Sequence, residues 1–155
     1  MAVRSALSRF LRRHRVFAAD TMVFIYHLQE HPRYSAATQV LLAAWEGGSH
    51  RGVASVISLA EVLVKPLRDG NAGAAEDYRR LLTTFPNLRL LEVNQSIAEA
   101  AAQLRAAYGL PMPDMIQAAT AVAAGATGFV TNDPAFRRVE GLEVLILDDV
   151  IQPRR

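Results

Sequence analysis

Four acidic side chains stand where the chain passes from one predicted element to the next. Asp20 ends the short apolar run VFAA, and Glu61 falls in the first turn of a predicted helix. Asp114 opens the apolar run MIQAATAVAA, and Asp133 comes just after the β-prone stretch GFVT. Carboxylates that lie close together repel one another, so their pKa values rise unless a cation neutralises them. Because Mg²⁺ and Mn²⁺ prefer oxygen ligands, the four acids predict a divalent metal site if the fold brings them together.

Each of these acids also has a purely structural explanation. The spacing of Ser58 and Glu61 fits a capping box, in which the glutamate side chain folds back onto the serine amide. Asp20 and Asp114 can each cap the helix that follows, and Asp133 can cap a short turn that begins with proline. Capping explains each residue taken alone, but it does not explain the four taken together.

The placement of the acids depends on a regular alternation of strands and helices. Short β-prone runs predict strands over residues 16–20, 53–57, 88–93, 128–131 and 142–147. Apolar residues at helical spacing predict helices over residues 21–29, 34–46, 58–67, 72–85, 95–108 and 114–124. This alternation is typical of a three-layer α/β/α fold, in which helices cover both faces of a central parallel sheet of four to five strands. The acids are then expected at the carboxyl edge of that sheet.

The composition is that of one folded domain. The chain has 155 residues, of which 51% are hydrophobic and 21% charged, so it can bury a core of its own. It contains no cysteine, which excludes disulfides and thiolate catalysis and fits a reducing compartment. No apolar run approaches the roughly 20 residues of a membrane span. We expect a cytoplasmic protein with a basic arm over residues 1–16, a domain over 17–150 and a tail over 151–155.

Basic residues gather in two places. The N-terminal stretch MAVRSALSRFLRRHR has five arginines and no acid, and three interpretations stay open: an arm that contacts RNA, a targeting peptide, and a tail or helix that only faces solvent. Runs of like charge usually do no more than face water, so the solvated arm is the expectation. Arg137 and Arg138 follow Asp133 closely enough to contact a phosphate backbone, or they form a solvated turn.

Two other enzyme classes that use Mg²⁺ and aspartate on such a sheet do not fit. Phosphatases of the haloacid dehalogenase type need a second aspartate two residues after the first, where this chain has Met22. Response-regulator receivers need a lysine after a late strand, whereas Lys65, the only lysine, falls inside the third predicted helix. Neither class therefore accounts for the four acids.

Four stretches together resemble the PIN domain family: ADT at 19–21, SLAE at 58–61, LPMPDMIQAATAVAAGA at 110–126 and FVTND at 129–133. More narrowly, they are similar to the toxin ribonucleases of VapBC-type toxin–antitoxin pairs. The resemblance implies a PIN-like fold and an Mg²⁺- or Mn²⁺-dependent endoribonuclease that hydrolyses RNA. It assigns catalysis and metal binding to Asp20, Glu61, Asp114 and Asp133, with Thr21, Thr131 and Asn132 in support.

The same resemblance implies two partners besides RNA, namely a cognate antitoxin protein and a second copy of the chain in a homodimer. The apolar residues Val40, Leu41 and Trp45 suit either a dimer interface or the core, and the core is the expectation. Other functions stay open: a PIN-like module that binds RNA or protein without cleavage, a housekeeping PIN nuclease without an antitoxin, and a nuclease that acts on DNA.

Overall fold

The computed structural model describes residues 2–151 and contains a five-stranded sheet in which all neighbouring strands are parallel. The strand order is β3-β2-β1-β4-β5. The strands are β1 (Val16–Ala19), β2 (Arg51–Ser55), β3 (Leu88–Leu91), β4 (Gly128–Thr131) and β5 (Glu143–Ile146). In the central strand, Ala18 pairs with Val53 of β2 and with Phe129 of β4. The predicted parallel sheet is confirmed, with the larger of the two expected strand numbers.

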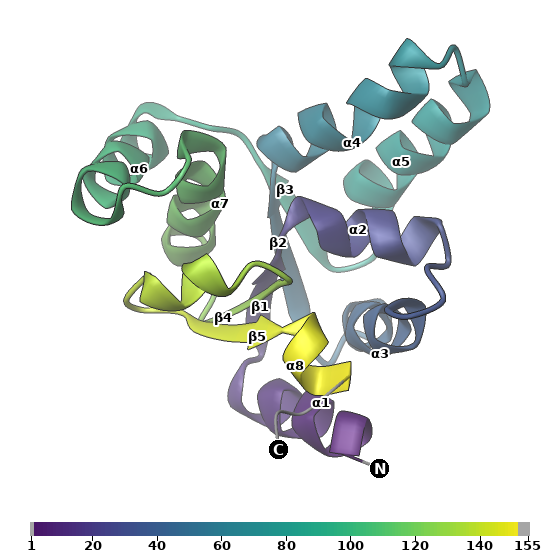
Figure 1. Cartoon of the computed structure of the whole chain (residues 1–155), viewed down its shortest axis with the longest axis horizontal. Helices are drawn as coiled ribbons and strands as arrows, with labels where there is room; N and C mark the ends of the chain where they lie inside the picture. The colour runs from purple at the N-terminus through teal and green to yellow at the C-terminus, as the bar shows by residue number, and fades with distance from the viewer. Residues whose placement is uncertain (1, 152–155) are drawn as a thin grey trace.

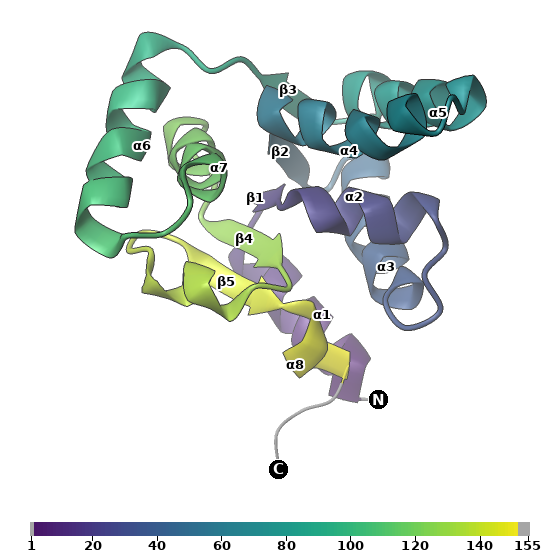
Figure 2. The same cartoon turned by 45° about the horizontal axis from the view of Figure 1, so that its top comes forward.

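Helices cover both faces of the sheet. They are α1 (Ala2–Arg13), α2 (Thr21–Leu28), α3 (Ser35–Glu46), α4 (Val56–Arg68), α5 (Ala72–Thr84), α6 (Gln95–Tyr108), α7 (Met112–Ala123), the 3₁₀ helix η1 (Pro134–Arg138) and α8 (Leu147–Ile151). Figure 1 shows α6 and α7 on one side of the sheet and α2, α3 and α8 on the other, and the hairpin of α4 and α5 packs beside α2 (Figure 2). The three-layer α/β/α fold is thus confirmed. None of the helices in the described range is both long enough and apolar enough to cross a membrane.

Side chains of the central strand alternate between two hydrophobic cores. Phe17 and Ala19 belong to the core beneath α1, α2, α3 and α8, whereas Ala18 belongs to the core beneath α6 and α7. Successive residues of a strand point to opposite faces, so β1 contributes to both cores at once. A sheet buried on both faces also explains why its strands read as short continuous apolar runs.

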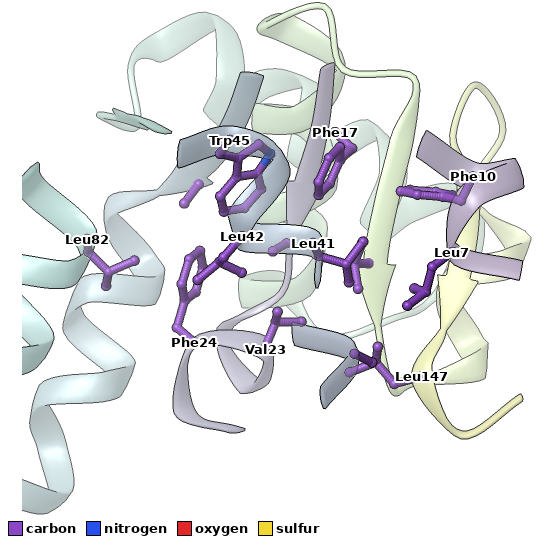
Figure 3. Close-up of a cluster of buried hydrophobic side chains, with 14 of the residues drawn as sticks. Leu7, Phe10, Phe17, Val23, Phe24, Leu41, Leu42, Trp45, Leu82 and Leu147 are labelled. Atoms are coloured by element: carbon purple, nitrogen blue, oxygen red, sulfur yellow. The ribbon is translucent and has the colours of Figure 1, made fainter. Parts of the chain in front are cut away.

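The larger core is organised around Trp45 of α3 (Figure 3). The Trp45 ring lies 4.9 Å from the ring of Phe17, measured between centroids, and both side chains are fully buried. Gly52 of β2 leaves room for the indole, because a Cβ atom there would lie 2.5 Å from Trp45 Cε2. Leu41 is also fully buried, whereas Val40 is 41% exposed. The expectation that this helix face serves the core is therefore confirmed for Leu41 and Trp45.

The N-terminal segment is a helix that packs on the sheet. Leu7 and Phe10 of α1 are only 1% and 3% exposed and belong to the larger core. His14, just after α1, is buried, and its ring nitrogens lie 2.8 Å from Thr127 Oγ1 and 2.9 Å from the carboxylate of Glu143. The expectation of an arm that only faces solvent is wrong, because apolar residues three to four positions apart give α1 a side that is buried against the domain.

Candidate active site

The four predicted acids reach the carboxyl edge of the sheet from different elements. Asp20 follows β1 directly, and Asp133 follows β4 after one intervening residue. Asp114 lies in the first turn of α7, and Glu61 lies in the second turn of α4. Burial, followed by the negative charges of the other three acids, raises the pKa of Asp114 to about 6. The fold thus brings all four close enough for their charges to act on one another.

Asp20 is held through both of its carboxylate oxygens. Oδ1 accepts a hydrogen bond from the backbone N–H of Thr21 at 2.7 Å, and Oδ2 accepts one from Thr131 Oγ1 at 2.8 Å. Burial raises the pKa of Asp20 above its usual value, although these hydrogen bonds partly oppose the shift. Asp20 therefore caps α2, as its structural explanation predicted, and it is also a buried carboxylate that a cation would stabilise.

Glu61 is held by a residue of α2. Its Oε1 accepts a hydrogen bond from Thr21 Oγ1 at 2.8 Å, and Thr21 Oγ1 lies 2.9 Å from Ser58 Oγ. The helix begins earlier than expected, at Val56, and its N-cap residue is Ser55. The predicted capping box of Ser58 and Glu61 is therefore wrong, because both side chains lie inside the helix and contact Thr21 instead.

Gln117 of α7 belongs to the same cluster and was not predicted. It is 4% exposed, and its Nε2 donates to Glu61 Oε1 at 3.2 Å and to Thr21 Oγ1 at 3.3 Å. Its Oε1 is buried and has no hydrogen-bond partner among residues 2–151. The sequence does hold a signal, because Gln117 is a long polar residue in an apolar run, three positions after Asp114 and so on the same side of the helix.

Asp133 combines a structural role with an electrostatic one. Its Oδ1 accepts a hydrogen bond from the backbone N–H of Ala135 at 2.9 Å, which caps η1 as predicted. Its own N–H donates to Thr131 Oγ1 at 3.0 Å, so Thr131 contacts both Asp20 and Asp133. Asp133 is exposed, and its charge still contributes, after burial, to the raised pKa of Asp114.

The donor set fits a hard divalent cation by its chemistry. All four side chains offer carboxylate oxygens, which Mg²⁺ and Mn²⁺ prefer. The raised pKa values of Asp20 and Asp114 come first from burial and also from neighbouring negative charge, both of which a cation would offset. In the part of the chain that the structure describes, no three Asp, Glu, His or Cys side chains are already arranged as a metal-binding group. The carboxylates would therefore have to move closer together to bind a cation.

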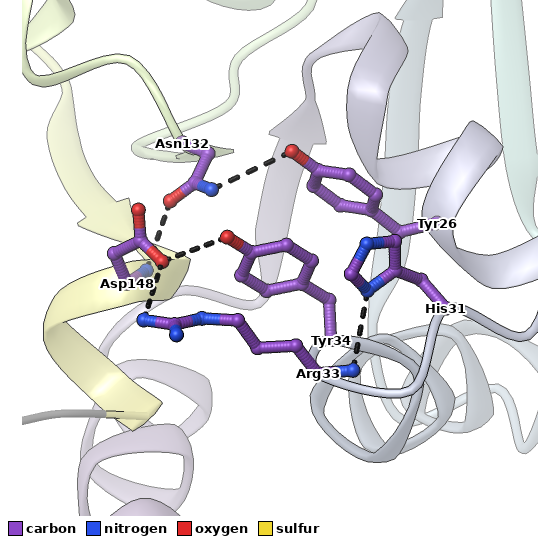
Figure 4. A network of polar contacts seen from close by, with 6 residues as sticks. All are labelled: Tyr26, His31, Arg33, Tyr34, Asn132 and Asp148. Atoms are coloured by element: carbon purple, nitrogen blue, oxygen red, sulfur yellow. Dashed lines mark hydrogen bonds and ion pairs between the residues drawn. The ribbon is translucent and has the colours of Figure 1, made fainter.

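A polar network fixes Asn132, the residue just before Asp133 (Figure 4). Its Oδ1 accepts a hydrogen bond from the backbone N–H of Asp148 at 2.9 Å, and its Nδ2 lies 3.5 Å from the hydroxyl of Tyr26. The hydroxyl of Tyr34 donates to Asp148 at 2.8 Å, and the rings of Tyr26 and Tyr34 are stacked with centroids 4.2 Å apart. The turn that carries Asp133 is thus tied to both α2 and α8.

The two arginines that follow Asp133 already have partners. Arg137 forms an ion pair with Asp149, and the guanidinium carbon of Arg138 lies 5.8 Å from the centroid of the Tyr108 ring. A phosphate that contacts Arg137 would have to share its guanidinium with Asp149.

A cavity of about 300 Å³ lies beside the acidic cluster, between α2, α4 and α5. Glu61 forms part of its wall, so the cavity adjoins the cluster directly. The remaining wall combines apolar residues such as Ile25 and Val62 with charged ones such as Lys65 and Asp77.

Comparisons with known proteins identify the family and the fold of the chain. The family model of the PIN domain matches residues 18–142, whereas no curated protein matches the chain. One solved structure with a similar fold is that of VapBC2 from Rickettsia felis, bound to a DNA fragment from the VapBC2 promoter. It has a TM-score of 0.66 and 19% identity, and the match covers 84% of this chain and 98% of that chain. A toxin–antitoxin complex from Klebsiella pneumoniae has a TM-score of 0.64 and 24% identity over 83% of this chain and 94% of that chain. VapBC-1 from nontypeable Haemophilus influenzae has a TM-score of 0.61 and 22% identity over 86% of this chain and 98% of that chain. At these identities the structures share a fold, and because the family model spans most of the chain, the chain belongs to the PIN domain family.

Proposed function

We propose that this protein is a metal-dependent endoribonuclease that hydrolyses phosphodiester bonds of RNA. PIN domains are a family of nucleases, and the chain belongs to that family. The observation that carries the proposal is the convergence of Asp20, Glu61, Asp114 and Asp133 at one sheet edge, where burial and then the charges of the other three acids raise the pKa of Asp114. A cluster of carboxylates suits a divalent cation that binds the oxygens of a phosphate.

Asp20 and Asp114 are the residues that we expect to hold the cation most directly. Bound Mg²⁺ or Mn²⁺ would supply Lewis-acid stabilisation of the charge that develops on the phosphate oxygens. Thr131 keeps one oxygen of Asp20 in place through its 2.8 Å hydrogen bond. Glu61 and Asp133 would complete the ligand set or orient the water that attacks phosphorus in line with the leaving oxygen.

An assay of RNA cleavage by the purified protein tests this proposal. The protein should cut RNA in the presence of Mg²⁺ or Mn²⁺ and stop when EDTA is added. Asp20→Asn and Asp114→Asn should each reduce cleavage to background while the fold stays intact. As a matched control, Asp69→Asn changes an exposed aspartate that pairs with Lys65, and it should cut at the wild-type rate. Cleavage that survives Asp114→Asn would contradict the assignment of the site.

We further propose that the protein is the toxin of a toxin–antitoxin pair. The similar solved structures named above are toxin–antitoxin assemblies, and the cavity beside Glu61, with its mixed apolar and polar wall, would give an antitoxin a contact next to the acidic site. Expression of the chain alone should arrest growth, and a small protein encoded beside its gene should bind it and restore growth. Normal growth with active enzyme would favour a housekeeping nuclease without an antitoxin. Arrest that persists with Asp114→Asn would favour a module that binds without cleaving.

We also propose that the protein acts on RNA in the cytoplasm as a homodimer. Val64 and Leu67 lie three positions apart on α4 and are 57% and 62% exposed, so they offer an apolar contact to a second copy. Sedimentation should give the mass of a dimer, and replacing both residues with serine should give a monomer. A monomeric wild-type protein would reject the dimer.

A further inference from the structure

One side of α1 packs against the domain, so its opposite side must face outward. Leu7 and Phe10 are buried in the larger core. The ring of Phe10 lies 5.4 Å from that of Phe17, and Phe10 would meet a Cβ atom at Gly128. These contacts leave α1 no freedom to turn about its axis without opening the core.

The outward side of α1 is basic. A helix turns by about 100° per residue, so Arg9 and Arg12 lie on the side of the helix opposite Leu7 and Phe10, and Arg4 lies at the border of that side. All three arginines are exposed, and α1 contains no acidic residue. None of the three takes part in an ion pair among residues 2–151. They form a surface of positive charge that the protein itself does not neutralise, and we call it the α1 arginine face.

The α1 arginine face supplies positive charge, which the acidic site lacks. A polyanion that approaches four carboxylates is repelled except where a cation bridges the two. Arg137, the predicted phosphate contact closest to the site in sequence, is occupied by Asp149. Arginine binds phosphate oxygens in a bidentate way, so three arginines on one rigid helix suit a phosphate backbone.

α1 is linked to the site through α8, whereas the end of α1 near His14 lies at the amino edge of the sheet, where His14 contacts Thr127 and Glu143. Figures 1 and 2 both show α1 beside α8, and the two helices pack together. In turn, α8 contacts the turn of the site, because the N–H of Asp148 donates to Asn132 beside Asp133. α1 precedes residues 18–142, the part that the PIN family model matches.

We propose that the α1 arginine face anchors the phosphate backbone of the RNA substrate outside the acidic site. This inference rests on the proposed ribonuclease function and deepens it. Arg4, Arg9 and Arg12 hold the strand by its phosphates, independently of base sequence, while the carboxylates act on a bond further along the strand.

The test must alter charge and leave the helix in place, because deleting α1 would also remove Leu7 and Phe10 from the core. We suggest the triple variant Arg4→Gln, Arg9→Gln, Arg12→Gln, compared in the Asp114→Asn background that prevents cleavage. The probe is a fluorescent single-stranded RNA, with affinity measured by anisotropy at several salt concentrations between 50 and 200 mM. The matched control replaces the exposed arginines Arg68, Arg80 and Arg89 with glutamine, which removes the same charge elsewhere.

Loss of three phosphate contacts should lower the slope of log affinity against log salt by roughly 2, because each contact with a single strand contributes about 0.7. The RNA affinity at the lowest salt should fall by about tenfold or more, and the control variant should keep the wild-type slope. In the cleaving background, the triple variant should raise KM for a long RNA and leave kcat unchanged.

Parallel salt plots for the triple variant and its parent would overturn the proposal. The proposal would also be overturned if the protein bound duplex DNA more tightly than RNA and the triple variant lost that binding, because the α1 arginine face would then bind DNA. The proposed ribonuclease function fails on different grounds, namely if the wild-type protein does not cut RNA in Mg²⁺ or Mn²⁺. Thermal unfolding of the triple variant should match that of its parent, which shows that the helix stays docked.

Discussion

At the scale of single residues, Asp114 shows how the acidic cluster opposes folding when no cation is bound. Its pKa rises from 3.8 to about 6 on folding, chiefly through burial and then through the charges of Asp20, Asp133 and Glu61. Between these two pH values the folded state keeps a proton that the unfolded state has released. The free energy of unfolding therefore falls as the pH rises from about 3.8 to about 6, and the loss is complete above that range.

Asp114→Asn should consequently stabilise the protein in metal-free buffer, and the gain should depend on pH. The neutral amide does not ionise, so the gain in the free energy of unfolding should be smallest near pH 4 and largest at pH 7. We expect roughly 1 kcal/mol at pH 7, because solvent screens charges at this half-buried position. Thermal unfolding of both proteins between pH 4 and pH 8 in EDTA measures the difference. A gap in Tm that does not change with pH would show that the charge of Asp114 is not its cause. Asp69→Asn, outside the cluster, should not reproduce the pattern.

Gln117 is a second residue with a role that its contacts predict. We expect Gln117→Leu to lower kcat/KM by about tenfold and to raise the Mg²⁺ concentration needed for half-maximal cleavage, because Glu61 loses the amide donor that holds it. Titration of cleavage with Mg²⁺ measures both effects. Gln103→Leu, the same substitution at an exposed position of α6, is the control and should behave as wild type. If Gln117→Leu changes only Tm and leaves the Mg²⁺ titration unaltered, the role of Gln117 is structural.

At the scale of elements, the close approach of α1 to β4 depends on Gly128. A Cβ atom at this position would lie 2.6 Å from Phe10 Cζ and 2.9 Å from His14 Cγ, both in fully packed surroundings. Gly128→Ala should therefore destabilise the protein by about 1–3 kcal/mol through overpacking, measured by urea unfolding. Gly73→Ala, inside α5, meets only Asn71 Oδ1 at 3.7 Å and should be neutral or slightly stabilising. Equal stability of Gly128→Ala and wild type would mean that α1 is not held against the sheet.

At the scale of the whole molecule, the acidic cluster should couple cation binding to stability. A cation that binds only the folded state at 100 times its Kd adds about 2.7 kcal/mol to the free energy of unfolding. For a chain of this length that corresponds to a rise in Tm of roughly 5–10 °C. Differential scanning calorimetry with Mg²⁺ or Mn²⁺ should show the rise in wild type and its loss in Asp20→Asn. A control in NaCl at equal ionic strength separates cation binding from charge screening. A wild-type Tm that does not rise with Mg²⁺ or Mn²⁺ would argue against a metal site.

The sequence alone determined the parallel sheet and the residues at its carboxyl edge. Strands and helices follow from local periodicity, and the residue that ends a strand or opens a helix is local too. Asp20, Asp114 and Asp133 could therefore be placed at one edge once the strands were known to be parallel. The capping roles of Asp20 and Asp133 could be predicted for the same reason, since a cap involves residues only a few positions apart. The cap expected of Asp114 is wrong, because α7 begins earlier, at Met112, and its N-cap residue is Pro111.

Only the tertiary structure decided the features that depend on distant segments. The apolar side of α1 became part of the core because Gly128, more than a hundred residues later, leaves room for Phe10. Glu61 accepts hydrogen bonds from Thr21 and Gln117, which lie on two other helices, and therefore does not form a capping box with Ser58. Arg137 forms an ion pair with Asp149, which comes after the next strand in the sequence. A local pattern fixes how a residue can point, but its partner is whichever group the packing of the whole chain brings within reach.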